Sequence, residues 1–281
     1  MIIATAVEEA RTQAAAWKRE GKRIGLVPTM GYLHEGHRSL IERAVSENDV
    51  VIVSVFVNPT QFAPGEDLET YPRDFAADTA LCEAAGAAMV FHPDPADMYA
   101  PDFDTYIEAG TLARELCGKT RPTHFRGVRT VVAKLMNIAR ADRAYFGQKD
   151  AQQLAIIRRM VRDLNMNVEV IGCPIIREED GLAKSSRNTY LDAEERQAAL
   201  ALSRSIAHGR ELVAAGASDP HAIVAAMRGI IEAEPLARID YVEAVTWDSL
   251  EPASTLAEPV LFAMAVYIGT TRLIDNFISE A

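Results

Sequence analysis

The chain has 281 residues, of which 49% are hydrophobic and 25% are charged, and its formal net charge is −11. These values are typical of a soluble globular protein that is long enough for one large or two modest domains. The acidic balance excludes a broad nucleic-acid-binding surface, because such a surface needs local positive charge. A small anionic substrate is compatible with it, since a few cations and helix dipoles can override the global sign.

Location and redox state follow from the N-terminus, the apolar runs and the cysteines. Residues 1–5 lack a basic region followed by a long apolar run, so no signal peptide is expected. The apolar run 50–57 is too short to span a bilayer. We therefore expect a cytoplasmic protein with no membrane partner. Cys82, Cys117 and Cys173 form no C-x-x-C pair, so each is expected to be a buried small apolar residue.

Strand-like and helix-like segments alternate over the first two thirds of the chain. Strands are predicted at 24–27, 50–57, 88–92, 144–147 and 168–173, and helices at 39–47, 75–85, 128–140 and 151–164. The run 50–57 is apolar at nearly every position, so both faces of this strand must be covered by helices. The alternation predicts a doubly wound parallel sheet, a Rossmann-like α/β domain, over residues 1–174.

The pattern changes after Pro174. A polar loop over 177–188 comes first. Two helices and two antiparallel strands are predicted after it, at 192–214, 220–234, 241–245 and 260–268. We predict a smaller C-terminal α+β domain at 175–281 that acts as a lid.

Two histidines, His34 and His37, lie between the first predicted strand and the following helix, after a glycine turn. Helix N-termini present unpaired N–H groups and a partial positive charge, so anions bind there. With His37 in the first helical turn, both rings can face one triphosphate. The alternative is a capped turn with two solvated histidines. The segment resembles the HxGH signature of nucleotidyltransferases, which transfer a nucleotidyl group and release pyrophosphate.

Polar turns also follow other predicted strands, one with Gln61 and one at 147–150. Ligands of open α/β sheets bind beyond the carboxyl ends of the strands, so these turns form a candidate site. A cation at a helix start is unfavourable unless an anion lies nearby, so Lys149 is predicted to bind phosphate. Asp150 fits either a helix cap or a ribose contact. The amides of Gln61 and Gln153 can bind a carboxylate or hydroxyl, although exposed glutamines are common.

The loop after Pro174 is the second strong signal. Ser185 and Ser186 are flanked by Lys184 and Arg187. Hydroxyl donors beside a bidentate guanidinium make a mobile clamp for an oxyanion. The alternative is a solvated, charged linker. The loop resembles the K-M-S-K-S loop of class I synthetases and related nucleotidyltransferases.

Together these motifs resemble the pantothenate synthetase (pantoate–β-alanine ligase) family. The match runs in order over nearly the whole chain. The motifs that carry it are P-T-M-G at 28–31, H-E-G-H at 34–37, F-V-N-P-T-Q-F at 56–62, Y-P-R at 71–73, H-F-R-G-V at 124–128, F-G-Q-K-D at 146–150, Q-Q-L at 152–154, D-G-L-A at 180–183, S-S-R-N at 185–188 and G-T-T-R-L-I-D-N at 269–276.

The resemblance implies two half-reactions. Pantoate and ATP give pantoyl adenylate and pyrophosphate, and the reaction of that adenylate with β-alanine then gives pantothenate and AMP.

The resemblance also implies a homodimer, a catalytic His37 assisted by His34 and Lys149, and Mg²⁺ on the phosphates. Asp78 is a candidate Mg²⁺ ligand, with a solvated helix residue as the alternative. The implied pantoate contacts are Gln61, Gln153 and, more weakly, Tyr71. The implied ATP site comprises Met30, Gly31, Tyr32, Leu33, His34, Glu35, Gly36, His37, Gly147, Gln148, Lys149, Asp150, Ile176, Lys184, Ser185, Ser186 and Arg187.

Two other functions compete with this interpretation. One is a different HxGH nucleotidyltransferase, which acts on a phosphate or alcohol acceptor and stops after one transfer. The other is a non-catalytic nucleotide-binding module. His37, Lys149 and the serine-arginine loop together argue against the second, because binding alone would not require all three.

Overall fold

The computed structural model describes residues 1–108 and 110–279. The chain divides into two compact units, each taken by itself below. The first comprises residues 1–110, 121–148 and 156–174, and the second comprises 111–120, 149–155 and 175–281. The second unit thus includes two short segments that precede Pro174 in the sequence.

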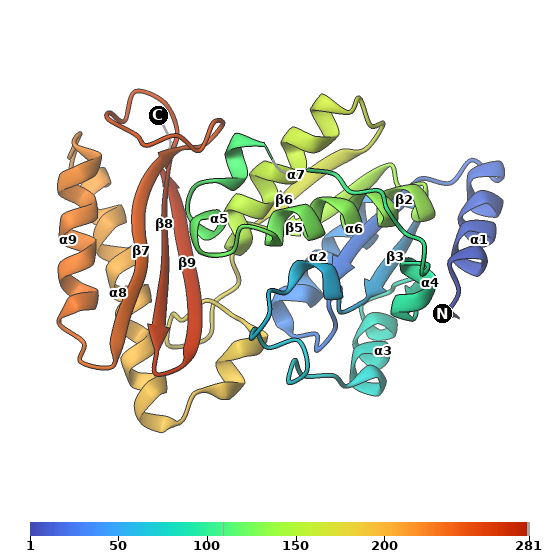
Figure 1. Cartoon of the computed structure of the whole chain (residues 1–281), viewed down its shortest axis with the longest axis horizontal. Coiled ribbons are helices and arrows are strands. Elements are labelled where there is room, and N and C mark those ends of the chain that lie inside the picture. The colour runs from blue at the N-terminus through green and yellow to red at the C-terminus, as the bar shows by residue number, and fades with distance from the viewer. Residues whose placement is uncertain (109, 280–281) are drawn as a thin grey trace. The chain divides into compact units, whose positions relative to one another are not determined.

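A six-stranded parallel sheet forms the centre of the first unit (Figure 1). Its strands are β1 (Ile2–Ala4), β2 (Ile24–Thr29), β3 (Val50–Val55), β4 (Met89–Phe91), β5 (Arg143–Gly147) and β6 (Glu169–Cys173), in the order β1-β4-β3-β2-β5-β6. The predicted parallel sheet is therefore confirmed. From β2 the chain proceeds outward through β3 to β4, and it returns to the other side of β2 with β5 and β6. The strand order therefore reverses between β2 and β5, which is where such sheets bind ligands.

Helices cover this sheet because its central strands are apolar on both faces. The helices are α1 (Val7–Arg19), α2 (Glu35–Glu47), α3 (Phe75–Ala84), α4 (Pro95–Met98), α6 (His124–Ala139) and α7 (Ala151–Asp163), the last of which crosses into the second unit. Val51, Val53 and Val55 of β3 pack with residues of α2 and α3. The alternate residue Ile52 is equally buried on the opposite face, as expected for a strand between two helical layers.

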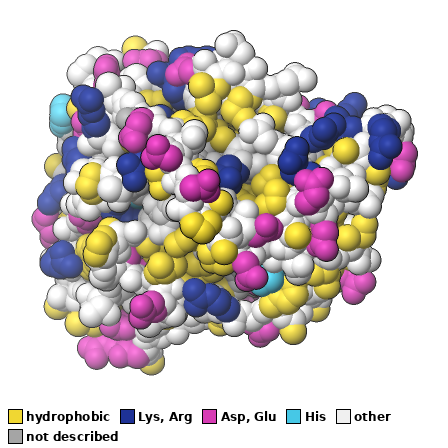
Figure 2. Space-filling view, turned by 45° about the vertical axis from the view of Figure 1, so that its right-hand side comes forward, with side chains coloured by type: hydrophobic (Ala, Val, Ile, Leu, Met, Phe, Trp, Pro, Cys, Tyr) yellow, Lys and Arg dark blue, Asp and Glu magenta, His cyan; other side chains and the backbone are white. Residues whose placement is uncertain are grey.

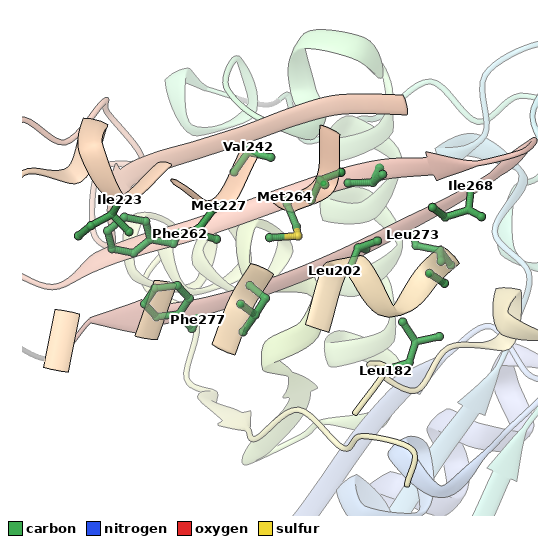
Figure 3. Packing of buried hydrophobic residues seen from close by; sticks show 14 of the residues in the cluster. Leu182, Leu202, Ile223, Met227, Val242, Phe262, Met264, Ile268, Leu273 and Phe277 are labelled. Atoms are coloured by element: carbon green, nitrogen blue, oxygen red, sulfur yellow. The ribbon is translucent and has the colours of Figure 1, made fainter. Parts of the chain in front are cut away.

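The second unit has a three-stranded antiparallel sheet. Its elements are α5 (Cys117–Thr120), the 3₁₀ turn Ser186–Tyr190, α8 (Ala193–Ala214), α9 (Pro220–Glu232), β7 (Ala237–Thr246), β8 (Val260–Ile268) and β9 (Thr271–Ser279). Figure 3 shows apolar side chains of the sheet facing those of α8 and α9. Phe262 and Phe277 stack there with ring centroids 4.8 Å apart. The predicted α+β character of this part of the chain is confirmed.

Surface charge and hydrophobicity agree with the composition. Figure 2 shows one face of the molecule, on which acidic and basic side chains are interspersed. Among the described residues, no helix is both long and apolar enough to cross a bilayer.

The cysteines are each expected from the sequence to be buried. Cys82 and Cys173 are buried as expected, whereas the expectation for Cys117 is wrong. Cys117 is half-buried, and its sulfur lies 3.3 Å from the Tyr241 hydroxyl and 3.4 Å from the Arg272 guanidinium.

Phe262 offers a test of the core of the second unit. We expect Phe262→Ala to lower the free energy of unfolding by about 3 to 5 kcal/mol, because it removes a fully buried ring and leaves a cavity. Chemical denaturation followed by circular dichroism measures the effect. Leu236→Ala is the control, because Leu236 is exposed and its loss should change stability by less than about 0.5 kcal/mol. Equal losses in the two variants would contradict this core.

Candidate active site

The turn between β2 and α2 has a tightly constrained backbone. Gly31 and Tyr32 both have positive φ angles, of 85° and 51°. A Cβ atom on residue 31 would lie 3.0 Å from the Asp78 carboxylate and 3.0 Å from Val55. Glycine is therefore required at position 31, both for the backbone angle and for the space. The turn directs the chain into α2 within the first unit.

Asp78 of α3 holds this turn in place. Its two carboxylate oxygens accept hydrogen bonds from the N–H groups of Tyr32, at 2.9 Å, and Leu33, at 2.6 Å. Asp78 is 2% exposed, so the alternative of a solvated helix residue is wrong. Burial raises the pKa of Asp78, although both backbone N–H groups oppose this shift. Sequence reasoning missed this positioning role, since the partners lie 45 and 46 residues away in the chain.

The two histidines form the start of α2, which begins at Glu35, earlier than predicted. His34 is the N-cap residue, and its Nδ1 accepts the N–H of Gly36 at 3.1 Å. His37 Nδ1 accepts the N–H of His34 at 3.3 Å, and the two ring centroids are 4.1 Å apart. A neutral imidazole that accepts at Nδ1 carries its proton on Nε2. Both rings are therefore set as Nε2–H donors beside a helix N-terminus, which suits an anion.

Gln61 lies in the turn after β3 and is held from several sides. It ends the 3₁₀ turn Pro59–Gln61 and is 8% exposed. Its Oε1 accepts a hydrogen bond from Asn58 at 3.1 Å, and its Nε2 lies 3.1 Å from the sulfur of Met30. The structure therefore brings Gln61 to the turn that leads to the histidines. Asn58, which sequence reasoning missed as a positioning residue, could have been recognised as the N-cap before Pro59.

Helix α6 fixes the same turn from the other side. A Cβ atom on Gly127 would collide with the carbonyl group of Thr60, so the helix and the turn are in backbone contact. His124 Nδ1 lies 2.9 Å from the carbonyl oxygen of Gln61. Tyr71 is buried, and its ring meets Phe62 edge-on with centroids 6.2 Å apart.

Lys149 and Asp150 lie in the 3₁₀ turn Gln148–Asp150, directly before α7. The Lys149 ammonium is 3.3 Å from the Asp150 carboxylate, and the lysine side chain is 21% exposed. Its carbonyl oxygen accepts a hydrogen bond from Asn276 at 2.9 Å. The boundary between the two units falls here: residues 121–148 belong to the first unit and residues 149–155, with Lys149, to the second.

The two adjacent glutamines of α7 differ. Gln152 is buried, and its amide donates to the carbonyl oxygens of Leu112 and Glu115 and accepts the N–H of Cys117. Through these contacts Gln152 holds the backbone of residues 111–120 in place. Gln153 is only half-buried, and its predicted substrate contact stays a prediction.

The segment with Ser185 and Ser186 is folded, so the alternative of a solvated linker is wrong. Residues 177–183 form a hairpin, closed by the bridge between Arg177 and Ala183. The N–H of Lys184 donates to the carbonyl oxygen of Ile176 at 2.9 Å. Ser185 then caps the 3₁₀ turn Ser186–Tyr190 by accepting the N–H of Arg187, and Ser186 is buried.

The described residues hold no cluster of metal-ligating side chains. Over residues 1–108 and 110–279, no group of three or more His, Cys, Asp or Glu side chains is placed to hold a metal ion. Both oxygens of Asp78 already accept backbone N–H groups. The geometry of Asp78 therefore favours a role in holding the turn over a role as a Mg²⁺ ligand. The Mg²⁺ contact of Asp78 stays a prediction.

The parallel sheet, its switch point at β2 and β5 and the histidine-capped helix define an α/β protein of the type that binds nucleotides at strand ends. Comparison with known proteins is more specific. A family model for pantoate–β-alanine ligase matches residues 2–278. A curated pantothenate synthetase of Ruminiclostridium cellulolyticum is 57% identical over 271 residues, covering 96% of each chain. One of Enterococcus faecalis is 54% identical over 280 residues, covering 100% of this chain and 99% of the relative.

Solved structures agree with these matches. Pantothenate synthetase from Thermus thermophilus superimposes with a TM-score of 0.93 at 46% identity, covering 99% of both chains. A pantoate–β-alanine ligase from Francisella tularensis, in complex with β,γ-ATP and β-alanine, gives a TM-score of 0.81 at 35% identity, covering 99% of this chain and 97% of that one. The chain belongs to the pantoate–β-alanine ligase family.

The raised pKa of Asp78 predicts a specific pH dependence. The folded protein binds the Asp78 proton more tightly than the unfolded chain, so protonation adds stability at low pH. That contribution is lost as the pH rises above about 4 and through the raised pKa. We therefore expect the free energy of unfolding of the wild type, minus that of Asp78→Asn, to fall as the pH rises above about 4. Denaturation at several pH values measures it, and a difference independent of pH would contradict the raised pKa.

Proposed function

We propose that this protein is an ATP-dependent ligase that condenses pantoate with β-alanine to give pantothenate, AMP and pyrophosphate. Membership of the pantoate–β-alanine ligase family over residues 2–278 supports this activity. The observation that carries it within the structure is the pair of imidazoles that cap α2, both with Nδ1 engaged by backbone N–H groups. The pair suits a polyphosphate.

We propose that the reaction passes through an adenylate. An oxygen of the pantoate carboxylate attacks the α-phosphorus of ATP, and the bond from that phosphorus to the bridging oxygen of pyrophosphate breaks. No general base is needed, because a carboxylate with a pKa of about 4 is already ionised at neutral pH. The amine of β-alanine then attacks the acyl carbon, loses a proton and expels AMP. Catalysis of the first step is therefore positioning and charge stabilisation.

The proposed roles of the side chains follow from charge and placement. His34 and His37 donate from Nε2 to phosphate oxygens as pyrophosphate leaves, with His37 the main catalytic group. The phosphates are bound by the cations of Lys149 and Arg187 and by the hydroxyl donors of Ser185 and Ser186. Lys149 lies two residues after Gly147, the last residue of β5, so the covalent chain keeps its backbone near the end of that strand.

The substrate contacts are proposed on the same basis. Gln61, held by Asn58, binds pantoate together with Gln153, and it also meets β-alanine. Tyr71 borders the pantoate site. The nucleotide is proposed to contact the segments 30–37 and 147–150, the backbone of Ile176, and residues 184–187. The Francisella relative, solved with β,γ-ATP and β-alanine, supports one protein binding both ligands.

Magnesium is proposed to enter with ATP. Mg²⁺ keeps several waters and takes one or two carboxylates plus substrate phosphates, so it does not need a preformed protein cluster. It would neutralise charge on the phosphates, and Asp78 remains its candidate protein ligand.

The larger organisation is also proposed. Residues 1–174 bind nucleotide and pantoate, and residues 175–281 close as a lid that protects the adenylate from water. The protein is proposed to be a cytoplasmic homodimer. Another HxGH nucleotidyltransferase with a phosphate or alcohol acceptor is the competing function.

The deciding experiment is incubation of the protein with pantoate, β-alanine, ATP and Mg²⁺, with products identified by mass spectrometry. Pantothenate and AMP are expected, with pyrophosphate release requiring pantoate and AMP release requiring β-alanine. Pyrophosphate release that requires a phosphate or alcohol acceptor in place of pantoate would favour the competing function. No turnover of ATP with any acceptor would favour a binding module.

We expect His37→Ala to lower the rate of pyrophosphate release by about 10²- to 10³-fold, as for the loss of one donor to a developing charge. Rapid-quench measurement of adenylate formation provides the rate. His208→Ala is the matched control, because its imidazole is 41% exposed on α8 and it should keep normal turnover. Thermal unfolding of both variants shows whether they fold, and near-normal turnover of folded His37→Ala would refute the catalytic role.

A further inference from the structure

Strand β9 carries polar side chains at buried positions, and the roles proposed above use none of them. Asp275 and Asn276 are 1% and 2% exposed, although their sheet packs against an apolar core. Burying a charge or an amide is costly unless it is paired. The partners of these two residues therefore indicate what their burial achieves.

Asp275 pairs with Arg177 at the base of the serine-bearing hairpin. The guanidinium donates to both carboxylate oxygens, at 2.7 and 2.9 Å. The same guanidinium donates to the carbonyl oxygen of Gly181 at 3.0 Å. One buried carboxylate thus fixes both arms of the hairpin at 177–183. The Ser185–Arg187 stretch leaves this hairpin after one more residue, so its position follows that of the hairpin.

Asn276 holds the turn that carries Lys149. Its Nδ2 donates to the Lys149 carbonyl oxygen at 2.9 Å, and this bond joins residues 127 positions apart in the sequence. The Lys149 backbone is therefore fixed by β9 while its ammonium stays partly exposed. A short 3₁₀ turn would otherwise have few constraints on its backbone.

These two anchors are adjacent residues of one strand. Consecutive Cα atoms are about 3.8 Å apart, and their side chains point to opposite faces of the sheet. Within the second unit, one rigid peptide therefore connects the hairpin of Ser185 and Arg187 to the turn of Lys149. We propose that Asp275 and Asn276 are positioning residues that set the spacing between Lys149 and the Ser185–Arg187 stretch for the phosphates of ATP. This proposal rests on the proposed function.

Stability alone does not account for the pair. A buried ion pair is often no more stabilising than apolar residues of the same size, so a strand that served only the core could be apolar here. Ser279 shows the contrast within β9. It is also buried and polar, but within residues 1–108 and 110–279 its hydroxyl bonds to the backbone of Val260 in the neighbouring strand alone.

The first test concerns Asn276. We expect Asn276→Ala to weaken ATP binding and slow pyrophosphate release by at least about tenfold, since a misplacement of about 1 Å can cost roughly 10²-fold. Ser279→Ala is the matched control on the same strand and should leave both quantities unchanged. Calorimetry with ATP and Mg²⁺ gives the affinity, and thermal unfolding checks the fold. If Asn276→Ala does not fold, Asn276→Ser is used, which keeps a shorter buried donor.

A double-mutant cycle separates positioning from a purely structural role. If Asn276 acts through Lys149, Asn276→Ala causes no further loss in a Lys149→Ala background. The same holds for Asp275→Asn in an Arg187→Ala background. Losses that add in both cycles, or single variants with wild-type affinity and rate, would overturn the proposal. Wild-type protein that binds ATP but makes no pantothenate would instead refute the proposed function, and the ATP affinities would still decide the positioning roles.

Discussion

The buried carboxylate of Asp78 constrains the backbone on which the histidine pair depends. By accepting the N–H groups of Tyr32 and Leu33, it holds two residues of a turn in which Gly31 and Tyr32 both have positive φ. Successive N–H groups of such a turn would otherwise form an anion-binding concavity. An internal carboxylate fills that role here, and the N–H groups of His34 and Gly36 that follow are accepted by the two imidazoles at the start of α2.

The capping of α2 shows how structure and chemistry are combined in the same side chains. A capping box usually joins a serine or threonine hydroxyl with a glutamate carboxylate. Here His34 and His37 take both positions, so the helix start is satisfied without adding a negative charge. A carboxylate at His37 would repel a triphosphate. The imidazoles stabilise the helix end through Nδ1 and carry the proton on Nε2. This local arrangement is compatible with the proposed anion site on a chain of net charge −11.

Sequence reasoning succeeds where the pattern is local. The apolar run of β3 predicts a strand covered on both faces, and the glycine turn with two histidines predicts a helix start, which the structure places at Glu35. Strand β1 escapes this reasoning because it is a short edge strand, with Ile2 and Ile3 exposed. The role of Asp78 escapes it because its partners are backbone groups 45 and 46 residues away, which leave no pattern in the side chains.

Strand β9 illustrates the deepest limit of such reasoning. Residues 271–279 alternate poorly, and the polar side chains of Arg272, Asp275 and Asn276 argue against a buried strand when only the sequence is considered. Their burial becomes favourable through partners 32, 98 and 127 residues away, at Asp240, Arg177 and Lys149. Each partner belongs to a different segment of the second unit. Because such distant pairs satisfy the polar groups only in the folded state, the last strand can fold only together with the segments that it positions.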